Sequence, residues 1–331
     1  MDFIENSMNK APWELDDEGV LYINADVDYY SRESPSPWFS MRSRIKKLVI
    51  SDGVSKIGRY AFFKCAALES VELPDSLVQI EEGAFGRCTA LEYVRLPASV
   101  TALAEGLFAR CKSLREVYIP ETVTELGDSV FFGCESLERI SLPDSVAQVG
   151  SYCFDGCISL AQLRLSEKLS EISDRAFHGC AALKTLDIPT AVTKIGDCAF
   201  EGCTGLEAVL IPPAVSHIGY CAFDGCTALT SVSLPDGLLE LGDYAFYRCT
   251  ALETAALPAK IVSTGEKIFK GCTALKTVSL PATVTGVGYA AFDGCTGLES
   301  LIYEGSREQW SKVNIDQLNA PLDSVNIVFK A

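Results

Sequence analysis

Hydrophobic and polar positions repeat along this chain with a period of 23 residues. Eleven phenylalanines mark the period, from Phe62 to Phe292, and a cysteine follows each of them after three residues, from Cys65 to Cys295. A leucine stands three residues beyond each cysteine, followed by two more aliphatic positions. One unit reads L-x-x-V-x-L-P-x-x-V-x-x-I-G-x-x-A-F-x-G-C-x-x. The period predicts a solenoid, because so short a unit buries a core only by stacking on its neighbours.

The L-x-x-V-x-L text predicts one short strand in every unit, since its second half alternates with period two. With Leu68, Val71 and Leu73 facing the core, Ser70 and Glu72 face outward on the strand-lined side. The proline that follows lacks an N–H, so the chain turns there. The V-x-x-I-G text predicts a second corner, and A-F-x-G-C a turn-like or short helical return. Eleven units stacked at about 4.8 Å each would form a rod on the order of 50 Å long.

The repeated text also carries a family resemblance. Its recurrent LPDSV, VTKIG, AFEGC and CTALKTVSLP segments resemble the BspA-like group of bacterial leucine-rich repeat proteins over residues 45–303. The resemblance implies a repeat solenoid with a parallel ladder of short β-strands and turn or short-helix returns, capped at both ends. One position departs from the general leucine-rich repeat pattern, because Ser76, Ser99, Thr122 and their equivalents stand where Asn is usual. A continuous Asn ladder is therefore excluded.

The sequence outside residues 45–303 does not repeat. Residues 1–44 resemble the N-terminal cap common in the family, and residues 304–331 resemble its usual C-terminal end. Terminal repeats need such caps because their outer faces meet water. We therefore predict one structural domain, made of a cap at 1–44, a solenoid of about eleven units at 45–303 and a cap at 304–331, and we expect it to be a monomer.

Composition and charge exclude several classes of protein. With 48% hydrophobic and 22% charged residues, the chain has the composition of a folded soluble protein. No run approaches the roughly 20 apolar residues of a membrane span, and the opening MDFIENSMNK lacks the basic start and apolar run of a signal peptide. The formal charge of −16 repels phosphate backbones and acidic lipid surfaces, so we expect neither nucleic-acid binding nor membrane insertion.

The cysteines allow two interpretations, a small buried hydrophobe beside each Phe or a reactive, metal-binding or disulfide framework. Metal sites usually contain C-x-x-C or Cys/His clusters, and neither occurs, so we predict no metal and favour the buried hydrophobe. Cys198 and Cys221 differ, because they stand 23 apart in a column that also holds Tyr60 and Arg175 and is expected to be partly exposed. If two units are joined by a disulfide, the sequence favours this pair.

No catalytic constellation emerges from the sequence. Its two histidines, His178 and His217, stand in different columns that are expected to face solvent, and no nucleophile elbow, phosphate loop or zinc-protease motif occurs. Acidic residues are plentiful, but no pair suited to glycoside hydrolysis stands out. Asp26 and Asp28 lack the other ligand positions of a calcium loop, which favours a solvated cap loop. We therefore expect no enzymatic activity and no cofactor.

The outward strand positions differ between the two halves of the repeat. The C-terminal half is mostly small and neutral, whereas the N-terminal half gathers large polar side chains: Tyr93, Arg95, Glu116, Tyr118, Arg139, Gln162 and Arg164. Tyr and Arg are enriched at binding hot spots. The hypothesis is that these residues bind a ligand on a concave strand face, and the alternative is that they are ordinary solvated positions.

Two hypotheses about the function therefore remain open. The first is a non-catalytic recognition or adhesion module that binds a protein or glycan, which the resemblance supports because BspA-like proteins are often exposed at the cell surface and implicated in adhesion. The second is a passive spacer rod within a larger surface protein. The resemblance implies a secreted or cell-surface location on a bacterium.

Overall fold

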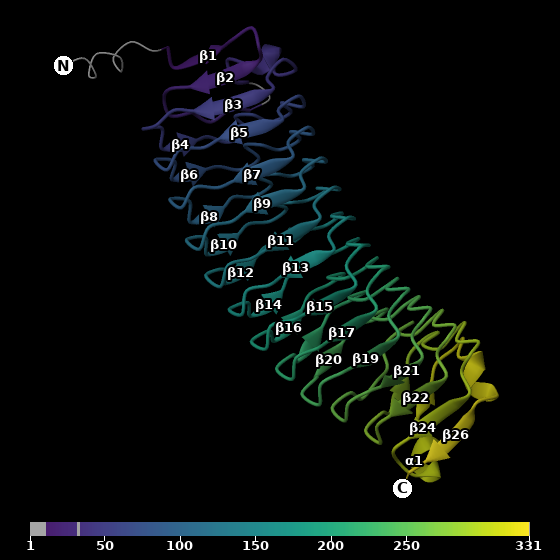
Figure 1. The fold of residues 1–331 in the computed structure, drawn as a ribbon. Coiled ribbons are helices and arrows are strands. Elements are labelled where there is room, and N and C mark those ends of the chain that lie inside the picture. Colours follow the sequence, from purple (N-terminus) through teal and green to yellow (C-terminus); the bar gives the residue numbers. More distant parts are fainter. Residues whose placement is uncertain (1–10, 32–33, 331) are drawn as a thin grey trace.

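The structure is a computed structural model that describes residues 11–31 and 34–330. The chain winds into one curved solenoid whose two ends lie far apart (Figure 1). Helix is confined to short segments near the ends of the described chain: η1 (Phe39–Met41), α1 (Arg307–Trp310) and η2 (Ala320–Asp323). The predicted solenoid is confirmed, and its A-F-x-G-C returns are stacked turns rather than short helices.

The main ladder takes one strand from each turn of the solenoid, in parallel. Within the repeats, paired strand residues are 23 positions apart, as Arg139 faces Gln162, whereas the offset is 27 between β2 and β3 and 26 between β24 and β26. Ser70 and Glu72 are exposed on either side of the half-buried Val71, which confirms the predicted alternation. The strands are β2 (Val20–Ile23), β3 (Lys47–Ile50), β5 (Ser70–Glu72), β7 (Tyr93–Arg95), β9 (Glu116–Tyr118), β11 (Arg139–Ser141), β13 (Gln162–Arg164), β15 (Thr185–Asp187), β17 (Ala208–Leu210), β19 (Ser231–Ser233), β21 (Thr254–Ala256), β22 (Thr277–Leu280), β24 (Ser300–Tyr303) and β26 (Asn326–Phe329).

A second ladder of two-residue strands follows the V-x-x-I-G text. Its first residue is usually exposed and its second buried, because the aliphatic side chain joins the core. At one turn the strand is replaced by a single bridge from Ser263 to Gly286. The strands are β4 (Lys56–Ile57), β6 (Gln79–Ile80), β8 (Ala102–Leu103), β10 (Glu125–Leu126), β12 (Gln148–Val149), β14 (Glu171–Ile172), β16 (Lys194–Ile195), β18 (His217–Ile218), β20 (Glu240–Leu241), β23 (Gly286–Val287) and β25 (Asn314–Ile315).

The non-repeating segments at both ends add strands to the ladders of the repeats. At the N-terminal end, β1 (Trp13–Leu15) pairs antiparallel with β2, which itself pairs parallel with β3. At the other end, β26 adds to β24 and β25 adds to β23. Trp38 is 2% exposed and stacks on Phe62 with ring centroids 5.4 Å apart, so it covers the first ring of the phenylalanine column.

The phenylalanines form one continuous stack through the core. From Phe62 to Phe292 each ring is at most 1% exposed, and neighbouring rings lie 5.2–5.8 Å apart and 7–23° from parallel. The cysteine column is buried beside this stack, as predicted. Each cysteine of this column from Cys88 onward also donates its thiol hydrogen to the phenylalanine carbonyl of the preceding turn, as Cys88 does to Phe62 at 3.3 Å. The cysteines therefore satisfy a buried acceptor as well as filling space.

In several units a Ser or Thr hydroxyl stands where a leucine-rich repeat usually has Asn, and in the others the position holds Lys, Ala or Gly. Ser76 Oγ donates to the carbonyl of Val54 at 2.8 Å, and Thr122 Oγ1 donates to that of Val100 at 2.8 Å. A hydroxyl can donate one hydrogen bond, whereas an Asn amide has two donors and an acceptor. At Ser76 and Thr122, the side chain therefore joins the corner after the strand to the preceding turn by a single hydrogen bond.

Candidate binding surface

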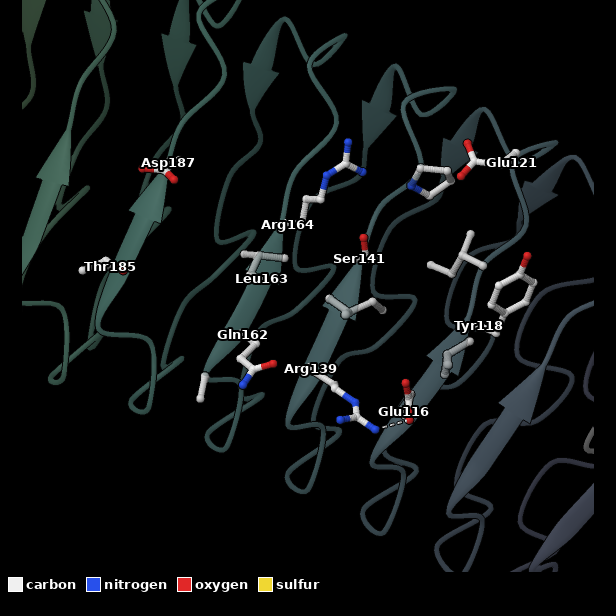
Figure 2. Close-up of a pocket in the computed structure, with 15 residues that line it drawn as sticks. Glu116, Tyr118, Glu121, Arg139, Ser141, Gln162, Leu163, Arg164, Thr185 and Asp187 are labelled. Carbon is white, nitrogen blue, oxygen red and sulfur yellow. Dashed lines mark hydrogen bonds and ion pairs between the residues drawn. The ribbon is translucent and has the colours of Figure 1, made fainter.

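A depression of about 550 Å³ lies on the outer face of the main ladder, across β9, β11, β13 and β15 (Figure 2). Five of the residues singled out in the sequence line it together: Glu116, Tyr118, Arg139, Gln162 and Arg164. The other two, Tyr93 and Arg95, lie on the adjacent turn in β7. Outward positions on strands of successive turns thus come together on one surface.

Arg139 and Glu116 form an ion pair across β11 and β9. Arg139 Nη2 lies 2.7 Å from Glu116 Oε2, and the two side chains remain 60% and 40% exposed. The hydrogen bond from Arg139 lowers the pKa of the Glu116 carboxyl. An exposed pair of this kind adds little to stability, so its effect here is to fix the direction of the guanidinium.

Arg164 is held at the opposite side of the depression. Its Nη1 donates to the carbonyl of Leu142 at 3.0 Å, and its Nη2 lies 2.7 Å from Asp144 Oδ1. The Arg164 side chain is nevertheless 53% exposed. A guanidinium has five N–H donors, so these two bonds orient Arg164 and leave other donors directed to solvent.

Aromatic rings lie next to the charged residues at the N-terminal side. The Arg95 guanidinium lies over the Tyr118 ring, 4.4 Å from its centroid. Tyr118 is 43% exposed and Tyr93 is 48% exposed. A cation–π contact limits the motion of both side chains, so part of the ordering that a ligand would require is already present.

The depression crosses two interruptions of the main ladder. Among the described strands, hydrogen-bonded pairing is absent between β5 and β7, between β9 and β11, and between β13 and β15. The second and third of these interruptions fall within the depression. The hollow therefore lies where adjacent turns of the main ladder are not joined through their strands.

Several further residues line the same surface, although the sequence pattern did not indicate them. They carry carboxylate or hydroxyl groups: Glu121, Ser141, Thr185 and Asp187. Ser141, Thr185 and Asp187 occupy outward strand positions, but selection for Tyr and Arg passed over them. Glu121 lies in the turn after β9 and had no strand pattern to identify it. The complete surface mixes both signs of charge with neutral hydrogen-bonding groups, which suits a polar ligand.

The histidines do not share a site. His217 lies on β18 with its side chain 46% exposed, as expected. His178 was expected to face solvent, but its side chain is only 27% exposed, and its Nδ1 lies 2.8 Å from Asp155 Oδ1. Asp155 is 6% exposed and also accepts a hydrogen bond from Arg175 at 3.2 Å. The expectation of solvent exposure is wrong at this turn, because carboxylates and cations of adjacent turns pair and cover one another.

Cys198 and Cys221 lie side by side on adjacent turns, and both are free thiols in the structure. Burial raises the pKa of the Cys221 thiol, and a hydrogen bond with the neighbouring Cys198 side chain acts in the opposite direction. Burial raises the pKa of the Cys198 thiol to about 12. Their disulfide stays a prediction.

Asp26 lies in the loop that the sequence analysis weighed as a calcium site. Its Oδ1 accepts the backbone N–H of Ser55 at 2.6 Å and of Lys56 at 3.1 Å. These bonds lower the pKa of the Asp26 carboxyl and tie the N-terminal segment to the first turn. Within residues 11–31 and 34–330, no three His, Cys, Asp or Glu side chains are grouped as a metal site.

The helices that the structure describes are all short. None of them has the length and apolar character needed to cross a bilayer.

Comparisons with known proteins agree with the geometry of the turns. Residues 35–149, 126–220 and 204–314 match the family described as BspA type leucine rich repeat region. Similar solved structures include a leucine-rich repeat protein from Bacteroides ovatus, with 24% identity, a TM-score of 0.65, and coverage of 99% of this chain and 100% of that one. A leucine rich cell surface protein from Faecalibacterium prausnitzii has 24% identity, a TM-score of 0.56, and coverage of 91% and 95%.

A third similar structure is the pneumococcal vaccine antigen PcpA, with 17% identity, a TM-score of 0.57, and coverage of 94% of this chain and 86% of that one. At these identities the structural likeness supports the fold alone. The search of curated proteins found no match. The family match spans most of the repeats described above, and the chain belongs to the BspA-type leucine-rich repeat family.

Proposed function

We propose that this chain is a non-catalytic recognition module that binds a protein or glycan in the depression on β9, β11, β13 and β15. The observation that carries the proposal is the grouping of Tyr118, Arg139 and Arg164 around one hollow on a strand face whose C-terminal half is mostly small and neutral. Tyr and Arg contribute strongly to binding because they offer rigid contact area and planar donors.

The state of these side chains supports the same proposal. Arg139 and Arg164 are each held by a carboxylate, and Tyr118 is held by Arg95, yet all remain accessible. A ligand that binds a preordered surface loses less conformational entropy than one that must order it. Hydroxyl, amide and carboxylate groups at Ser141, Gln162 and Asp187 add further partners for a polar ligand.

We propose a cell-surface location on a bacterium for this activity. The support is the family itself together with the leucine rich cell surface protein from Faecalibacterium prausnitzii, whose fold is similar. A solenoid presents an extended face whose outward side chains vary without disturbing the core, which suits recognition at a surface.

The test uses substitutions that other turns of this chain already contain. Tyr118→Ser and Arg164→Ser place the residue of Ser141 and Ser233 in that column, and Arg139→Thr places the residue of Thr185. We would measure binding of wild type and of this triple variant to extracellular-matrix proteins, mucins and neutral glycans. Leu210→Ser serves as the control, because Leu210 is 70% exposed in the same column but outside the depression.

The expected result is capture of a ligand by wild type and by Leu210→Ser, with binding at least about tenfold weaker in the triple variant. Circular dichroism would establish that all three proteins are folded. Equal binding by the triple variant would contradict the proposed site. Absence of any binding would favour the spacer rod, in which the length of the solenoid matters and its strand face does not.

A further inference from the structure

A second surface lies on the stacked turns near the N-terminal end, away from the main ladder. It begins with the residue before each cysteine of the repeat, which takes a positive φ in every unit: 63° at Lys64, 62° at Arg87 and 62° at Arg110. Seven other units have glycine there, and the remaining one has Arg248. Glycine adopts a positive φ without steric cost, whereas a residue with a side chain does so at a cost. The four residues that replace glycine in this column are therefore unfavourable for the backbone, and all four are basic.

Three of these four cations have no carboxylate partner among the described residues. Arg248 pairs with the buried Asp224, which accounts for its presence. Lys64, Arg87 and Arg110 instead lie exposed next to aromatic rings: Lys64 Nζ is 5.4 Å and Arg87 Cζ 5.9 Å from the Phe63 centroid, and Arg110 Cζ is 5.2 Å from that of Phe132.

Nearby carboxylates are already engaged with other cations. Glu81 pairs with Lys56 at 3.0 Å, and Glu82 pairs with Arg59 and accepts from the Tyr60 hydroxyl. The positive charges of the row are therefore not cancelled by those neighbours. On a chain with a net charge of −16 they form a local region of opposite sign.

The backbone holds the three cations in one row. Lys64 N–H donates to the carbonyl of Gly86 at 2.9 Å, and Arg87 N–H donates to that of Ala109 at 2.8 Å. The row therefore rises by one turn from each cation to the next. At the usual ladder spacing it extends over about 10 Å.

An aromatic cavity of about 300 Å³ adjoins the row at Lys64. Its walls include the rings of Tyr30, Phe39, Tyr60 and Phe63, of which the last two meet edge to face at 5.6 Å. Glycines of the next turn make room for these rings.

A Cβ added at Gly83 would lie 2.5 Å from the Tyr60 ring, and one added at Gly86 would lie 3.0 Å from the Phe63 ring. The aromatic walls and the cation row share Phe63 and Lys64, so they form one continuous surface.

We propose that this surface binds an anionic polysaccharide, with sulfate or carboxylate groups on Lys64, Arg87 and Arg110 and a sugar ring against the aromatic walls of the cavity. Charged groups that recur along a sugar chain match cations that recur along a row. The apolar C–H face of a pyranose ring packs on aromatic rings, and guanidinium groups bind sulfate or carboxylate with paired donors.

Other polyanions fit this surface less well. A lipid bilayer or a nucleic-acid duplex presents dense negative charge over a wide area, which the acidic remainder of the protein repels. A single polysaccharide chain contacts only the row and the cavity. This inference goes beyond the proposed function, since it concerns another face and another set of residues.

The test replaces Lys64, Arg87 and Arg110 together by glycine, the residue that most units already have at this column. Folding should tolerate the change because glycine accepts the positive φ. The control is K168Q/K194Q/K260Q, which removes the same amount of charge from lysines that form no ion pair among the described residues. Phe63→Ala, which introduces the residue that Ala109 places in the same column, tests the cavity separately.

Binding to chondroitin sulfate would be measured at low salt, with dextran, anionic-lipid vesicles and duplex DNA as comparison probes. We expect wild type and the lysine control to bind chondroitin sulfate, and the glycine variant and Phe63→Ala to bind at least about tenfold more weakly. The strand-face variant with Tyr118, Arg139 and Arg164 replaced should bind like wild type, which separates this inference from the proposed function.

Three outcomes would overturn the inference. One is no binding of chondroitin sulfate by wild type, and another is unchanged binding by the glycine variant. The third is equal binding of vesicles or DNA that depends on the same cations, which would assign the row to polyanions in general. Unchanged binding by Phe63→Ala would overturn the assignment of a sugar ring to the cavity.

Discussion

The Cys203 thiol donates a hydrogen bond to the carbonyl oxygen of Phe177, at 3.1 Å, from one turn of the solenoid to the preceding one. The same carbonyl accepts the backbone N–H of Cys180 at 3.2 Å, within its own turn. Cys203 is completely buried and Phe177 is 1% exposed. This relationship gives a physical reason for cysteine, and not simply any small side chain, beside the phenylalanine stack.

Replacing Cys203 by alanine should lower the free energy of unfolding by about 1–2 kcal/mol. The substitution removes the thiol donor and leaves a small cavity beside Phe177. Urea unfolding followed by circular dichroism would measure the change. Cys198→Ala is the control, because Cys198 is only half-buried and lies outside the column, and its effect should be smaller. Equal unfolding midpoints for Cys203→Ala and wild type would contradict a role for the thiol bond.

The thiols of the native protein should resist alkylation near neutral pH. Burial raises the pKa of Cys65 and of Cys203 to about 12, so little of the reactive thiolate forms. After unfolding without reductant, mass spectrometry should count fourteen alkylated cysteines if all are free. A count two lower, with Cys198 and Cys221 unmodified, would establish the disulfide that the sequence favours.

Replacing Phe200 by alanine should lower the free energy of unfolding by about 3–5 kcal/mol. Phe200 is fully buried and stacks between Phe177 at 5.6 Å and Phe223 at 5.2 Å, so its loss opens a cavity inside the column. Phe200→Leu retains more of the side-chain volume, so it should lower the free energy of unfolding by less than Phe200→Ala does. A melting temperature for Phe200→Ala equal to that of wild type would refute the importance of the stack.

Arg248→Gly should destabilise the fold by about 1–3 kcal/mol at neutral pH, while Arg87→Gly at the equivalent position should have little effect. Both changes introduce the residue that most units have there. Arg248 Nη2 donates to both carboxylate oxygens of Asp224, at 2.9 and 3.1 Å, and Asp224 is 5% exposed. Loss of Arg248 therefore leaves a buried carboxylate unpaired, whereas Arg87 has no such partner among the described residues.

The loss of folding stability caused by Arg248→Gly should depend on pH. Burial raises the pKa of Asp224 above the ordinary value of 3.8, against the opposing effect of Arg248, and removing Arg248 raises it further. A carboxyl with a raised folded-state pKa stabilises the fold at low pH, and that contribution is lost as the pH rises through the folded-state value. The variant should therefore approach wild-type stability as the pH falls toward 4. A difference in stability from wild type that stays constant from neutral to acidic pH would contradict the ion-pair explanation.

Much of the fold follows from the chain's own repetition. The 23-residue spacing from Phe62 to Phe292 aligns the units without any structure, so strands, inward residues and the buried cysteines could all be predicted. The strand alternation likewise placed Glu116, Arg139 and Arg164 on one outward face. The A-F-x-G-C segment was compatible with either a turn or a short helix, and the structure shows the turn.

The period, the core columns and the outward positions could all be predicted from the sequence, since each depends on the local alternation of apolar and polar residues. Which charged side chains form ion pairs depends instead on how the turns stack. Arg139 reaches Glu116 and Arg164 reaches Asp144, while Arg87 has no carboxylate partner in the described part of the chain, although all three are exposed arginines in a regular repeat. These pairings depend on the offset between adjacent turns and on the direction of each side chain, which a one-dimensional pattern does not contain. For the same reason the depression and the cation row beside the aromatic cavity emerged only once the turns were stacked.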